Sequence, residues 1–456
     1  MKRRVHFVGI GGAGLSAIAR ILNNQGDVIT GSDLVRSPYA AALEELGIKI
    51  TYEHKAENIQ SADFVIASSA IPETNVELEA ARESGIPVYH RDLFLPEMLR
   101  QYRVIGIAGT HGKTTTTGLI SFILDSAGWE PSFIVGGILE NYQSNAGSGE
   151  SSLFVIEADE YARTFLSIHP SIAVVTTVEH DHPDCYPTAD DFRDAFQEYV
   201  HQTKEAVVVC LDDKTAAGLH VETPVRKTYG FDPDADWRAE NQRLESNGRM
   251  FFDVYFSEKM AGTLSTELHG KHNVLNILAA WTVCDHLGMK FAVFKKHLAA
   301  YRGVARRFEV LGEVGGVAVI DDYAHHPTEI LATLSGAREA YPDRKIYAVF
   351  QPHTYSRLRQ FFNGFTKAFC DADYVVVTAV FAARERKDET VGGRELAEGM
   401  DHPDAVFMET FTEAVEFLYT KVSSPAVVIT LSAGDGNEIG KELLQKLESG
   451  REVSDD

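Results

Sequence analysis

A glycine-rich turn at residues 109–115, Gly-Thr-His-Gly-Lys-Thr-Thr, follows an apolar, strand-like stretch at residues 103–108 and precedes a helix-like stretch at residues 115–127. Such a turn points successive backbone N–H groups at one spot, and the helix N-terminus adds partial positive charge, so the site suits phosphate. Lys113 can then reach the β- and γ-phosphates of a nucleotide, and the Thr114 hydroxyl can bind Mg²⁺. The alternative is a plain glycine turn with an exposed lysine, which the Gly-Lys-Thr-Thr run disfavours.

The composition is that of an ordinary globular protein. At 456 residues the chain is too long for one hydrophobic core, so we expect two or three domains. The formal net charge of -23 disfavours a nucleic-acid partner, which would need a basic surface. It still permits an anionic small substrate, because a few local basic groups and helix N-termini suffice to bind a diphosphate. The longest apolar runs are far shorter than a membrane span.

The first residues and the cysteines indicate a cytoplasmic protein. The N-terminal Met-Lys-Arg-Arg leads directly into a strand-like stretch and a glycine turn, without the apolar segment of a secretory signal. The four cysteines have no paired spacing, which favours reduced thiols over a disulfide framework or a zinc site. They are Cys185, Cys210, Cys284 and Cys370.

Strand-like and helix-like stretches alternate along the chain, which predicts an α/β fold with parallel sheets. We divide the chain into three domains on this pattern. The first covers residues 1–98, and the second, residues 99–306, contains the phosphate loop. The second also contains a predicted antiparallel hairpin, formed by residues 250–255 and 262–267. The third domain covers residues 307–456.

A second glycine-rich turn, residues 9–14, fits the pattern G-x-G-x-x-G after a strand-like stretch at residues 5–8. Asp33 ends the next strand-like stretch, which is typical of a dinucleotide fold with this carboxylate on a ribose hydroxyl. The function of a nicotinamide-dependent dehydrogenase is therefore a serious alternative. The glycines specify only a diphosphate near a helix N-terminus, however, and a nucleotide-sugar diphosphate satisfies the same requirement.

Two polar clusters follow apolar strands of the second domain. Glu157 follows residues 153–156, and His182 lies just beyond residues 173–177. Ligands collect at the carboxyl ends of parallel strands, so both clusters are expected beside the phosphate loop. With Thr114 they would complete a Mg²⁺ site, although imidazole is an uncommon ligand of this ion. Alone, Glu157 could be a helix N-cap or a surface acid and His182 a turn histidine; together on adjacent strand ends they favour a metal.

Three further positions have both a functional and a plain structural interpretation. Asn273, at the start of a helix-like stretch, could cap that helix or contact a purine edge. Arg307 could belong to a salt-bridge patch on the surface. Alternatively, it could reach the active site from the third domain and neutralise charge on the phosphoryl group during its transfer. Arg357 follows a strand-like stretch and suits bidentate capture of a carboxylate, although a lone arginine is more often a surface charge.

In this order, the motifs resemble those of the Mur ligases of peptidoglycan synthesis. The similarity extends from about residue 5 to about residue 440, nearly the whole chain. In a usual phosphate loop the first glycine stands five residues before the position of Gly112, but this chain has Ile107 there. Its first loop glycine is Gly109, only three residues before Gly112, and this short loop is itself a mark of the family. The motifs that carry the resemblance are residues 9–14, 68–71, 109–114, 157–160, 181–182 and 270–273, with Arg307 and Asp322.

Two segments, residues 321–329 and 350–357, resemble the branch of the family that adds L-alanine, and the ligase that recycles murein tripeptide is the nearest rival. Family members that add the second to fourth units of the peptide carry a lysine downstream of the Asp-His motif. Residues 183–203 contain no lysine, which matches the alanine-adding branch. Some members have an arginine where Thr354 stands. If that arginine orients the amino-acid carboxylate, Arg357 would have to serve here.

The resemblance also implies the role of each domain. It predicts a Rossmann-like domain for the UDP end of the substrate, a central P-loop ATPase-like domain, and a Rossmann-like C-terminal domain for the amino acid. UDP-substrate contacts are assigned to Gly9, Gly11, Gly12, Ala13, Gly14, Asp33 and Ser69. ATP contacts are assigned to Gly109, Thr110, His111, Gly112, Lys113, Thr114, Thr115, Asn273, Arg307 and Asp322. Amino-acid contacts are assigned to His325, His353, Tyr355 and Arg357, and metal ligation to Thr114, Glu157 and His182.

The implied reaction uses ATP with Mg²⁺ or Mn²⁺. The lactyl carboxylate of UDP-N-acetylmuramate attacks the γ-phosphate, and the acyl phosphate then receives the amine of L-alanine. Catalytic roles are assigned to Lys113, His182, Arg307, His325 and His326, with one of the last two guiding the amine proton. A monomer or a homodimer is expected. A third class of function, an ATP-driven binding module without ligation, would release phosphate without forming an amide.

Overall fold

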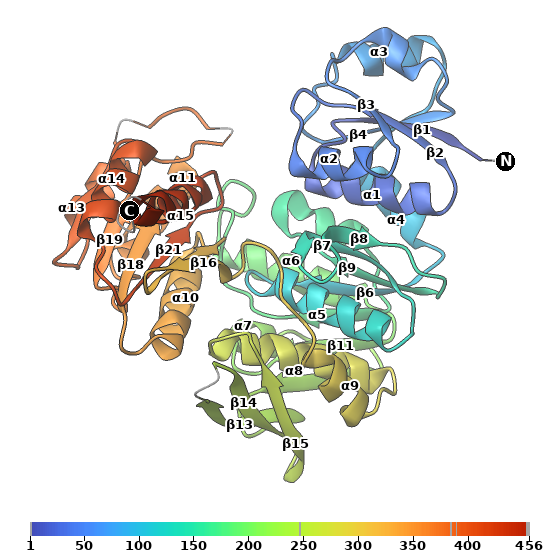
Figure 1. Ribbon diagram of the computed structural model, residues 1–456. Helices are drawn as coiled ribbons and strands as arrows, with labels where there is room; N and C mark the ends of the chain where they lie inside the picture. Colours follow the sequence, from blue (N-terminus) through green and yellow to red (C-terminus); the bar gives the residue numbers. More distant parts are fainter. Residues whose placement is uncertain (1, 246–247, 384, 389, 453–456) are drawn as a thin grey trace.

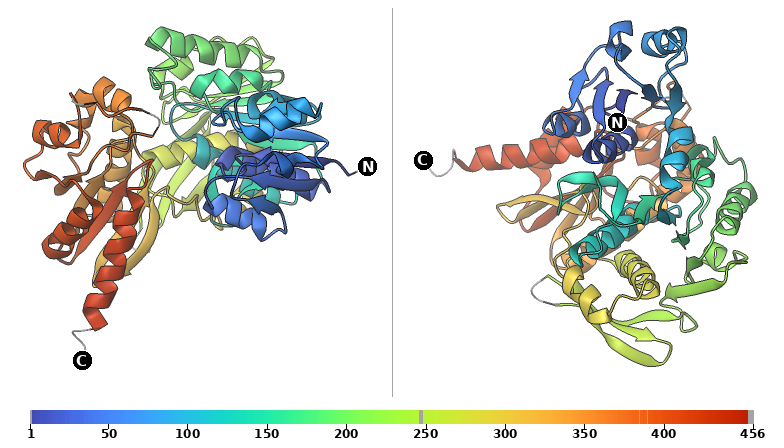
Figure 2. Two further views of the ribbon diagram at one scale, coloured as in Figure 1. Left: turned by 90° about the horizontal axis from the view of Figure 1, so that it is seen from above. Right: turned by 90° about the vertical axis from the view of Figure 1, so that its right-hand side faces the viewer.

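The computed structural model describes residues 2–245, 248–383, 385–388 and 390–452. Three α/β lobes, each built on its own sheet, follow one another along the chain (Figure 1). The last helix, α15 (Asn437–Glu452), extends away from the other two lobes (Figure 2). The α/β fold with three domains is confirmed, and one sheet lies within each predicted domain. None of the described helices is long and apolar enough to cross a membrane.

The first sheet has the strand order β3-β2-β1-β4-β5, and all its pairs are parallel, as predicted. Because β1 lies between β2 and β4, the glycine turn that follows it is at the point where the strand order reverses, where such sheets bind ligands. The elements are β1 (Arg4–Val8), α1 (Ala13–Asn24), β2 (Val28–Ser32), α2 (Pro38–Glu44), β3 (Lys49–Thr51), η1 (Ala56–Ile59), β4 (Phe64–Ala67), α3 (Val76–Glu83), β5 (Val88–His90) and α4 (Arg91–Leu99).

A fully buried carboxylate, Glu77 on α3, ties this sheet to its neighbouring loops. It accepts hydrogen bonds from Ser32 Oγ (2.5 Å), Asn58 Nδ2 (2.5 Å) and the Lys55 backbone N (3.2 Å). Burial alone would raise the pKa of Glu77, but contacts with His6, Ser32 and Asn58 outweigh it and lower the pKa to about 2. The carboxylate therefore stabilises the folded first domain in its ionised form.

Replacing this carboxylate is expected to destabilise the protein. A pKa lowered from 4.5 to about 2 means that the stabilisation is fully present above pH 4.5 and is lost as the pH falls towards 2. Glu77→Gln should therefore lower the free energy of unfolding at pH 7 by about 3 kcal/mol. Urea unfolding at pH 7 and at pH 3.5 checks this, because the difference from wild type should shrink at the lower pH. Glu79→Gln, at an exposed position of the same helix, is the matched control.

The central sheet has the order β15-β14-β13-β12-β11-β10-β6-β9-β7-β8. Its parallel strands are buried on both faces: α5 and α8 cover one, and α6 covers the other together with part of the first domain. The elements are β6 (Arg103–Ala108), α5 (Lys113–Ser126), β7 (Ser132–Leu139), β8 (Ser144–Gly147), β9 (Leu153–Glu157), η2 (Tyr161–Ser167), β10 (Ile172–Val175), α6 (Ala189–His201), β11 (Ala206–Cys210), α7 (Lys214–Ala217), β12 (Val225–Gly230), β13 (Trp237–Leu244), β14 (Met250–Phe256), β15 (Lys259–Thr266), α8 (Lys271–His286) and α9 (Phe291–Leu298).

The predicted antiparallel hairpin is confirmed as β14 and β15, but it is part of a larger antiparallel extension. β14 also pairs with β13, which the sequence pattern did not reveal. Residues at the start of β13 are buried and those beyond them are polar and more exposed, so β13 lacks a long apolar run. At the opposite edge of the sheet, β7 and β8 form a second antiparallel pair.

The third sheet has the order β16-β17-β21-β18-β19-β20, and only the β16–β17 pair is antiparallel. Residues from α10 and α13 pack on one face, and residues from α14 and α15 pack on the other. The elements are β16 (Glu309–Val314), β17 (Val317–Asp322), α10 (Pro327–Ala340), β18 (Lys345–Phe350), α11 (Tyr355–Gln360), α12 (Phe362–Phe365), β19 (Tyr374–Val377), α13 (Gly393–Gly399), β20 (Ala405–Phe407), α14 (Phe411–Lys421), β21 (Ala426–Leu431) and α15.

Candidate active site

The phosphate loop joins β6 to α5, as the sequence predicts, and two of its glycines are required by the geometry. Gly109 has φ 140° and Gly112 has φ 81°, a region that favours glycine. A side chain at Gly109 would collide with Thr176 in the neighbouring loop, and one at Gly112 would collide with Asn276 of α8. The loop is therefore packed between two other elements, and the backbone N–H groups of Thr110 and His111 donate to Thr177 O (2.9 Å) and Thr177 Oγ1 (3.0 Å).

The ammonium group of Lys113 is buried among loop carbonyls and carboxylates. Its Nζ donates to Gly109 O (2.5 Å), Thr110 O (3.2 Å) and Glu160 Oε1 (2.8 Å). Burial alone would lower the pKa of Lys113, but the negative charge around Glu160 outweighs it and raises the pKa. Lys113 is thus a fixed positive charge at the phosphate loop.

The carboxylates that follow β9 fit a hard cation. Thr114 Oγ1 donates to Glu157 Oε1 (3.1 Å), and the Gly136 backbone N donates to Glu157 Oε2 (2.8 Å). Burial raises the pKa of Glu157, and burial also raises that of Asp159, so these crowded acids lack sufficient compensating charge. Glu160 Oε2 is buried without a hydrogen-bond partner. Hydroxyl and carboxylate oxygens beside a phosphate loop are the donors that Mg²⁺ prefers, and a divalent cation would relieve this crowding.

The strands that carry the two predicted clusters are not adjacent, contrary to the sequence prediction. β9 and β10 both pair with β6 and lie on opposite sides of it. The error does not separate the clusters from the loop, because β6 is the strand that leads into it. Glu157 and His182 therefore flank the phosphate loop, and His182 Nε2 lies 3.7 Å from Glu160 Oε1.

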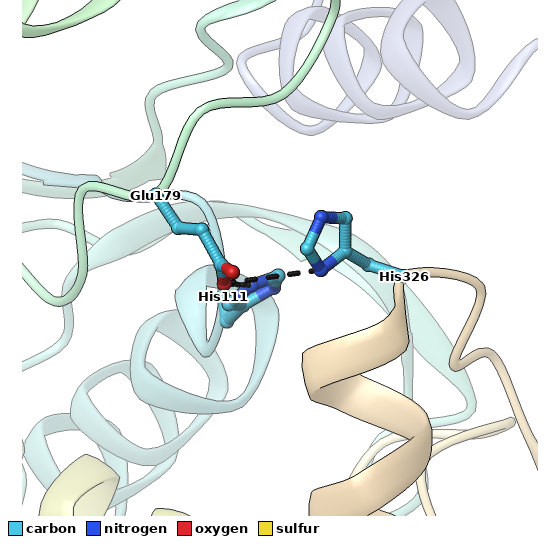
Figure 3. A group of neighbouring side chains, drawn as sticks. All are labelled: His111, Glu179 and His326. Atoms are coloured by element: carbon cyan, nitrogen blue, oxygen red, sulfur yellow. Dashed lines mark hydrogen bonds and ion pairs between the residues drawn. The ribbon is translucent and has the colours of Figure 1, made fainter. Parts of the chain in front are cut away.

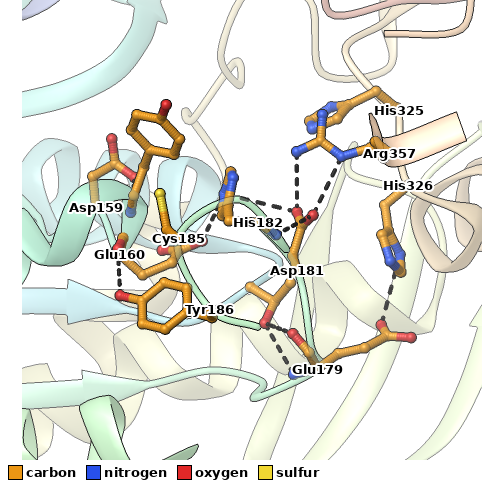
Figure 4. A network of polar contacts seen from close by, with 12 residues as sticks. Asp159, Glu160, Glu179, Asp181, His182, Cys185, Tyr186, His325, His326 and Arg357 are labelled. Carbon is orange, nitrogen blue, oxygen red and sulfur yellow. Dashed lines mark hydrogen bonds and ion pairs between the residues drawn. The ribbon is translucent and has the colours of Figure 1, made fainter. Parts of the chain in front are cut away.

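Arg357, the predicted carboxylate-binding arginine, is paired with a carboxylate of the central domain. Its Nε lies 3.3 Å from Asp181 Oδ1, and its Nη2 lies 3.3 Å from Asp181 Oδ2 (Figure 4). His353 Nδ1 lies 3.1 Å from Arg357 Nη1. Although burial alone would raise it, the pKa of Asp181 is held well below its usual range by Arg357 and nearby histidines. This buried pair joins the second and third domains.

A pocket beside the loop unites the remaining predicted nucleotide contacts. It is lined by Asn273, Arg307 and Asp322, among others. Asn273 is not the N-cap of α8, because Gly270 holds that position and Asn273 Nδ2 donates to His269 O (2.8 Å). The capping alternative is therefore wrong. Burial raises the pKa of Asp322 to about 6, and its carboxylate accepts backbone hydrogen bonds within the third domain.

A second, larger cleft lies where all three domains meet. Its lining residues come from the turn after β1, from the phosphate loop and the carboxylates near it, and from the start of the third domain. Among the predicted residues, it contains Ala13, Gly14, Thr110, His111, Gly112, Lys113, Thr114, Glu157, His182, Arg307, His325 and His326. Its lining residues outside the predicted set include Tyr39, Arg91 and Tyr323. No recognisable motif surrounds Tyr39 or Arg91, whereas Tyr323 lies inside the Asp-Asp-Tyr segment and could have been found.

Several predicted residues are engaged elsewhere. The Asp33 carboxylate accepts from the backbone N of Gly11 (2.8 Å) and of Leu34 (2.8 Å), so it braces the glycine turn. Ser69 is exposed in the loop after β4. Tyr355 packs against the core of the third domain, and its backbone N donates to Glu385 (2.6 Å). Their contacts with substrates stay predictions.

Family models match the chain in three consecutive stretches. These are the Mur ligase family catalytic domain at residues 4–103, the Mur ligase middle domain at residues 107–284, and the Mur ligase glutamate ligase domain at residues 306–434. The chain belongs to the Mur ligase family. The resemblance noted in the sequence is thereby confirmed, and the stretches fall within the three predicted domains except near their boundaries.

Relatives of this Mur ligase cover nearly its whole length. It is 39% identical over 452 residues to a protein of Caldanaerobacter subterraneus subsp. tengcongensis named UDP-N-acetylmuramate–L-alanine ligase, covering 97% of this chain and 98% of that one. The crystal structure of the UDP-N-acetylmuramate-alanine ligase MurC of Thermotoga maritima has a TM-score of 0.83 and 29% identity, covering 98% and 100% of the two chains. A murein peptide ligase of Psychrobacter arcticus has a TM-score of 0.69 at 24% identity, which shows a shared fold.

Proposed function

We propose that this chain joins L-alanine to the lactyl carboxylate of UDP-N-acetylmuramate through an acyl phosphate, with ATP converted to ADP and phosphate, as a step of peptidoglycan precursor synthesis. The Mur ligase family is ATP-dependent. The observation that carries the proposal is the cleft between the three domains, which combines Lys113 with Glu157 and with basic groups of the third domain. The named relatives support L-alanine as the amino acid and UDP-N-acetylmuramate as the carboxylate substrate. With four free cysteines, we propose that the enzyme works in the cytoplasm.

The first chemical step brings two anions together, and the chain supplies positive charge for it. Lys113 would neutralise the γ-phosphate while the lactyl carboxylate attacks it, and Arg307 would add charge from the third domain. Thr114, Glu157 and His182 would hold Mg²⁺, which supplies further charge neutralisation when bound. Closure of the cleft would exclude water, because an acyl phosphate hydrolyses readily.

The second step transfers the acyl group to the amine of L-alanine, which must lose a proton. His325 and His326 line the cleft. Burial lowers the pKa of His325 to about 3 and also lowers that of His326, so both rings are neutral near pH 7. A neutral imidazole can accept the proton, and we propose that one of this pair does so as phosphate leaves. His325 Nδ1 donates to Tyr323 O (2.9 Å), which leaves its Nε2 unprotonated and able to accept. His326 Nδ1 instead accepts from the Thr328 backbone N, so the proton of its neutral ring is on Nε2, and His325 is the better placed of the two.

The assay that tests this function measures ADP release from ATP with UDP-N-acetylmuramate and, in turn, L-alanine, glycine, L-serine and murein tripeptide. We expect the highest kcat/KM with L-alanine, and amide formation equal to ADP release. Turnover with the tripeptide alone would indicate the recycling ligase instead. ADP release without amide would indicate an ATP-driven module, and hydride transfer from NADH would revive the dehydrogenase.

A further inference from the structure

Three side chains, one of them from the phosphate loop itself, converge outside the predicted magnesium site. His111 and Glu179 belong to the central domain, and His326 stands at the start of α10 in the third (Figure 3). One ligand atom from each residue lies within 4.8 Å of the other two. His111 Nε2 is 2.8 Å from Glu179 Oε2, and His326 Nδ1 is 3.8 Å from the same oxygen. We propose that these residues form a second metal site, for a borderline divalent ion such as Zn²⁺ or Co²⁺, that joins the two domains.

The donor set determines the class of metal. Two imidazoles and one carboxylate suit Zn²⁺, Co²⁺ or Ni²⁺, whereas Mg²⁺ prefers oxygen donors. In a tetrahedral zinc site the ligand atoms are about 3.3 Å apart, so side-chain rotations that move them by up to about 1.5 Å would close the cluster around an ion. Three protein ligands leave a fourth position for water. This set differs from Thr114, Glu157 and His182, the residues predicted for Mg²⁺.

The outer contacts of the cluster are those that a metal site requires. His111 Nδ1 lies 3.2 Å from Glu329 Oε1, so a carboxylate orients the ring from its other nitrogen. Thr328 Oγ1 donates to Glu179 Oε1 (2.8 Å) and fixes the orientation of that carboxylate. Thus both Glu329 and Thr328, from the first turn of α10, support ligands of the central domain.

The cluster can be reached from solvent and can exchange a proton for the metal. His111, Glu179 and Thr328 line a surface hollow, and the Glu179 side chain is 40% exposed. Metal binding forms bonds to His111 Nε2, His326 Nδ1 and Glu179. It breaks the His111 N–H bond that now points at Glu179, and this proton passes to solvent. The weak hydrogen bond from the Thr328 backbone N to His326 Nδ1 (3.3 Å) is given up.

Titration of the whole protein with Co²⁺, after treatment with a chelator and without substrates, tests this site. We expect one equivalent to bind with the intense visible absorption of a four- or five-coordinate ion, and Zn²⁺ to displace it. Glu179→Gln and His326→Gln should each weaken Co²⁺ affinity at least tenfold, since each loses one of three ligands. One equivalent of Zn²⁺ should also raise the Tm of wild type but not of these variants.

His220→Gln is the matched control, because His220 lies with His201 and Glu222 in an exposed group of similar composition. It should bind Co²⁺ as wild type does. Loss of Co²⁺ binding in His220→Gln with retention in Glu179→Gln would overturn the proposal, as would a weak, six-coordinate spectrum in wild type. The titration uses no nucleotide or sugar, so its outcome is independent of the proposed ligase activity.

Discussion

Lys113→Ala is expected to lower kcat for ADP release by about 10³-fold or more, while the affinity for UDP-N-acetylmuramate stays within about threefold of wild type. Lys113 is the cation at the phosphate loop, with its Nζ held by Gly109 O, Thr110 O and Glu160. The predicted UDP contacts lie on the first domain, so the substitution should leave them intact. Steady-state kinetics and calorimetric titration with the UDP substrate measure the two quantities. Lys204→Ala, at an exposed lysine, is the control and should turn over normally.

Loss of Lys113 also leaves the buried Glu160 without its partner, so a reduced Tm would complicate the result. The double variant Lys113→Ala with Glu160→Gln removes both charges and should recover much of the lost stability. It should remain inactive, because the phosphate-neutralising charge is still absent. Recovery of turnover along with stability would show that Lys113 acts only as a structural ion-pair partner.

The positions of the phosphate loop and of Glu157 at strand ends were predicted correctly, because each motif is a short, continuous stretch of sequence. The phosphate loop and Glu157 follow apolar strands, and the sequence alone indicates that parallel strands bring such ends together. The order of strands is a different matter. It depends on how β6 inserts between β9 and β10, which no local pattern encodes, and so the predicted adjacency of the two clusters was wrong.

Contacts between domains were the least predictable. Asp181 and Arg357 are 176 positions apart in the chain. The sequence around each one suggests a role for that residue, and neither suggests that the two form an ion pair. Tyr39 and Arg91 reach the cleft only because the first domain packs against the second. The sequence pattern also does not reveal helix α4, because Pro96 lies inside it and proline normally disfavours a helix interior. Burial of its apolar side chains in the core shared with the central domain offsets this local preference.

Arg357→Lys is expected to raise KM for L-alanine about 100-fold, with KM for ATP nearly unchanged. Lysine keeps the charge but cannot form the planar, two-point contact that an arginine makes with a carboxylate. Initial rates at varied L-alanine and at varied ATP separate the two constants. Arg359→Lys is the control, because Arg359 lies on the same helix with its side chain 62% exposed and pairs with Asp388. It should leave both constants near wild type.

The internal pair with Asp181 raises the question of whether Arg357 binds substrate or only joins two domains. Asp181→Asn separates these roles, because it removes the partner and leaves the guanidinium in place. If Arg357 binds the amino-acid carboxylate, this variant should lower the Tm and leave KM for L-alanine within a few fold, whereas Arg357→Lys should mainly raise KM. Equal effects of both variants on KM and Tm would contradict a binding role. In the expected case, the substrate carboxylate binds the Arg357 guanidinium either beside Asp181 or in its place. His353, whose Nδ1 lies 3.1 Å from Arg357 Nη1, already orients that guanidinium.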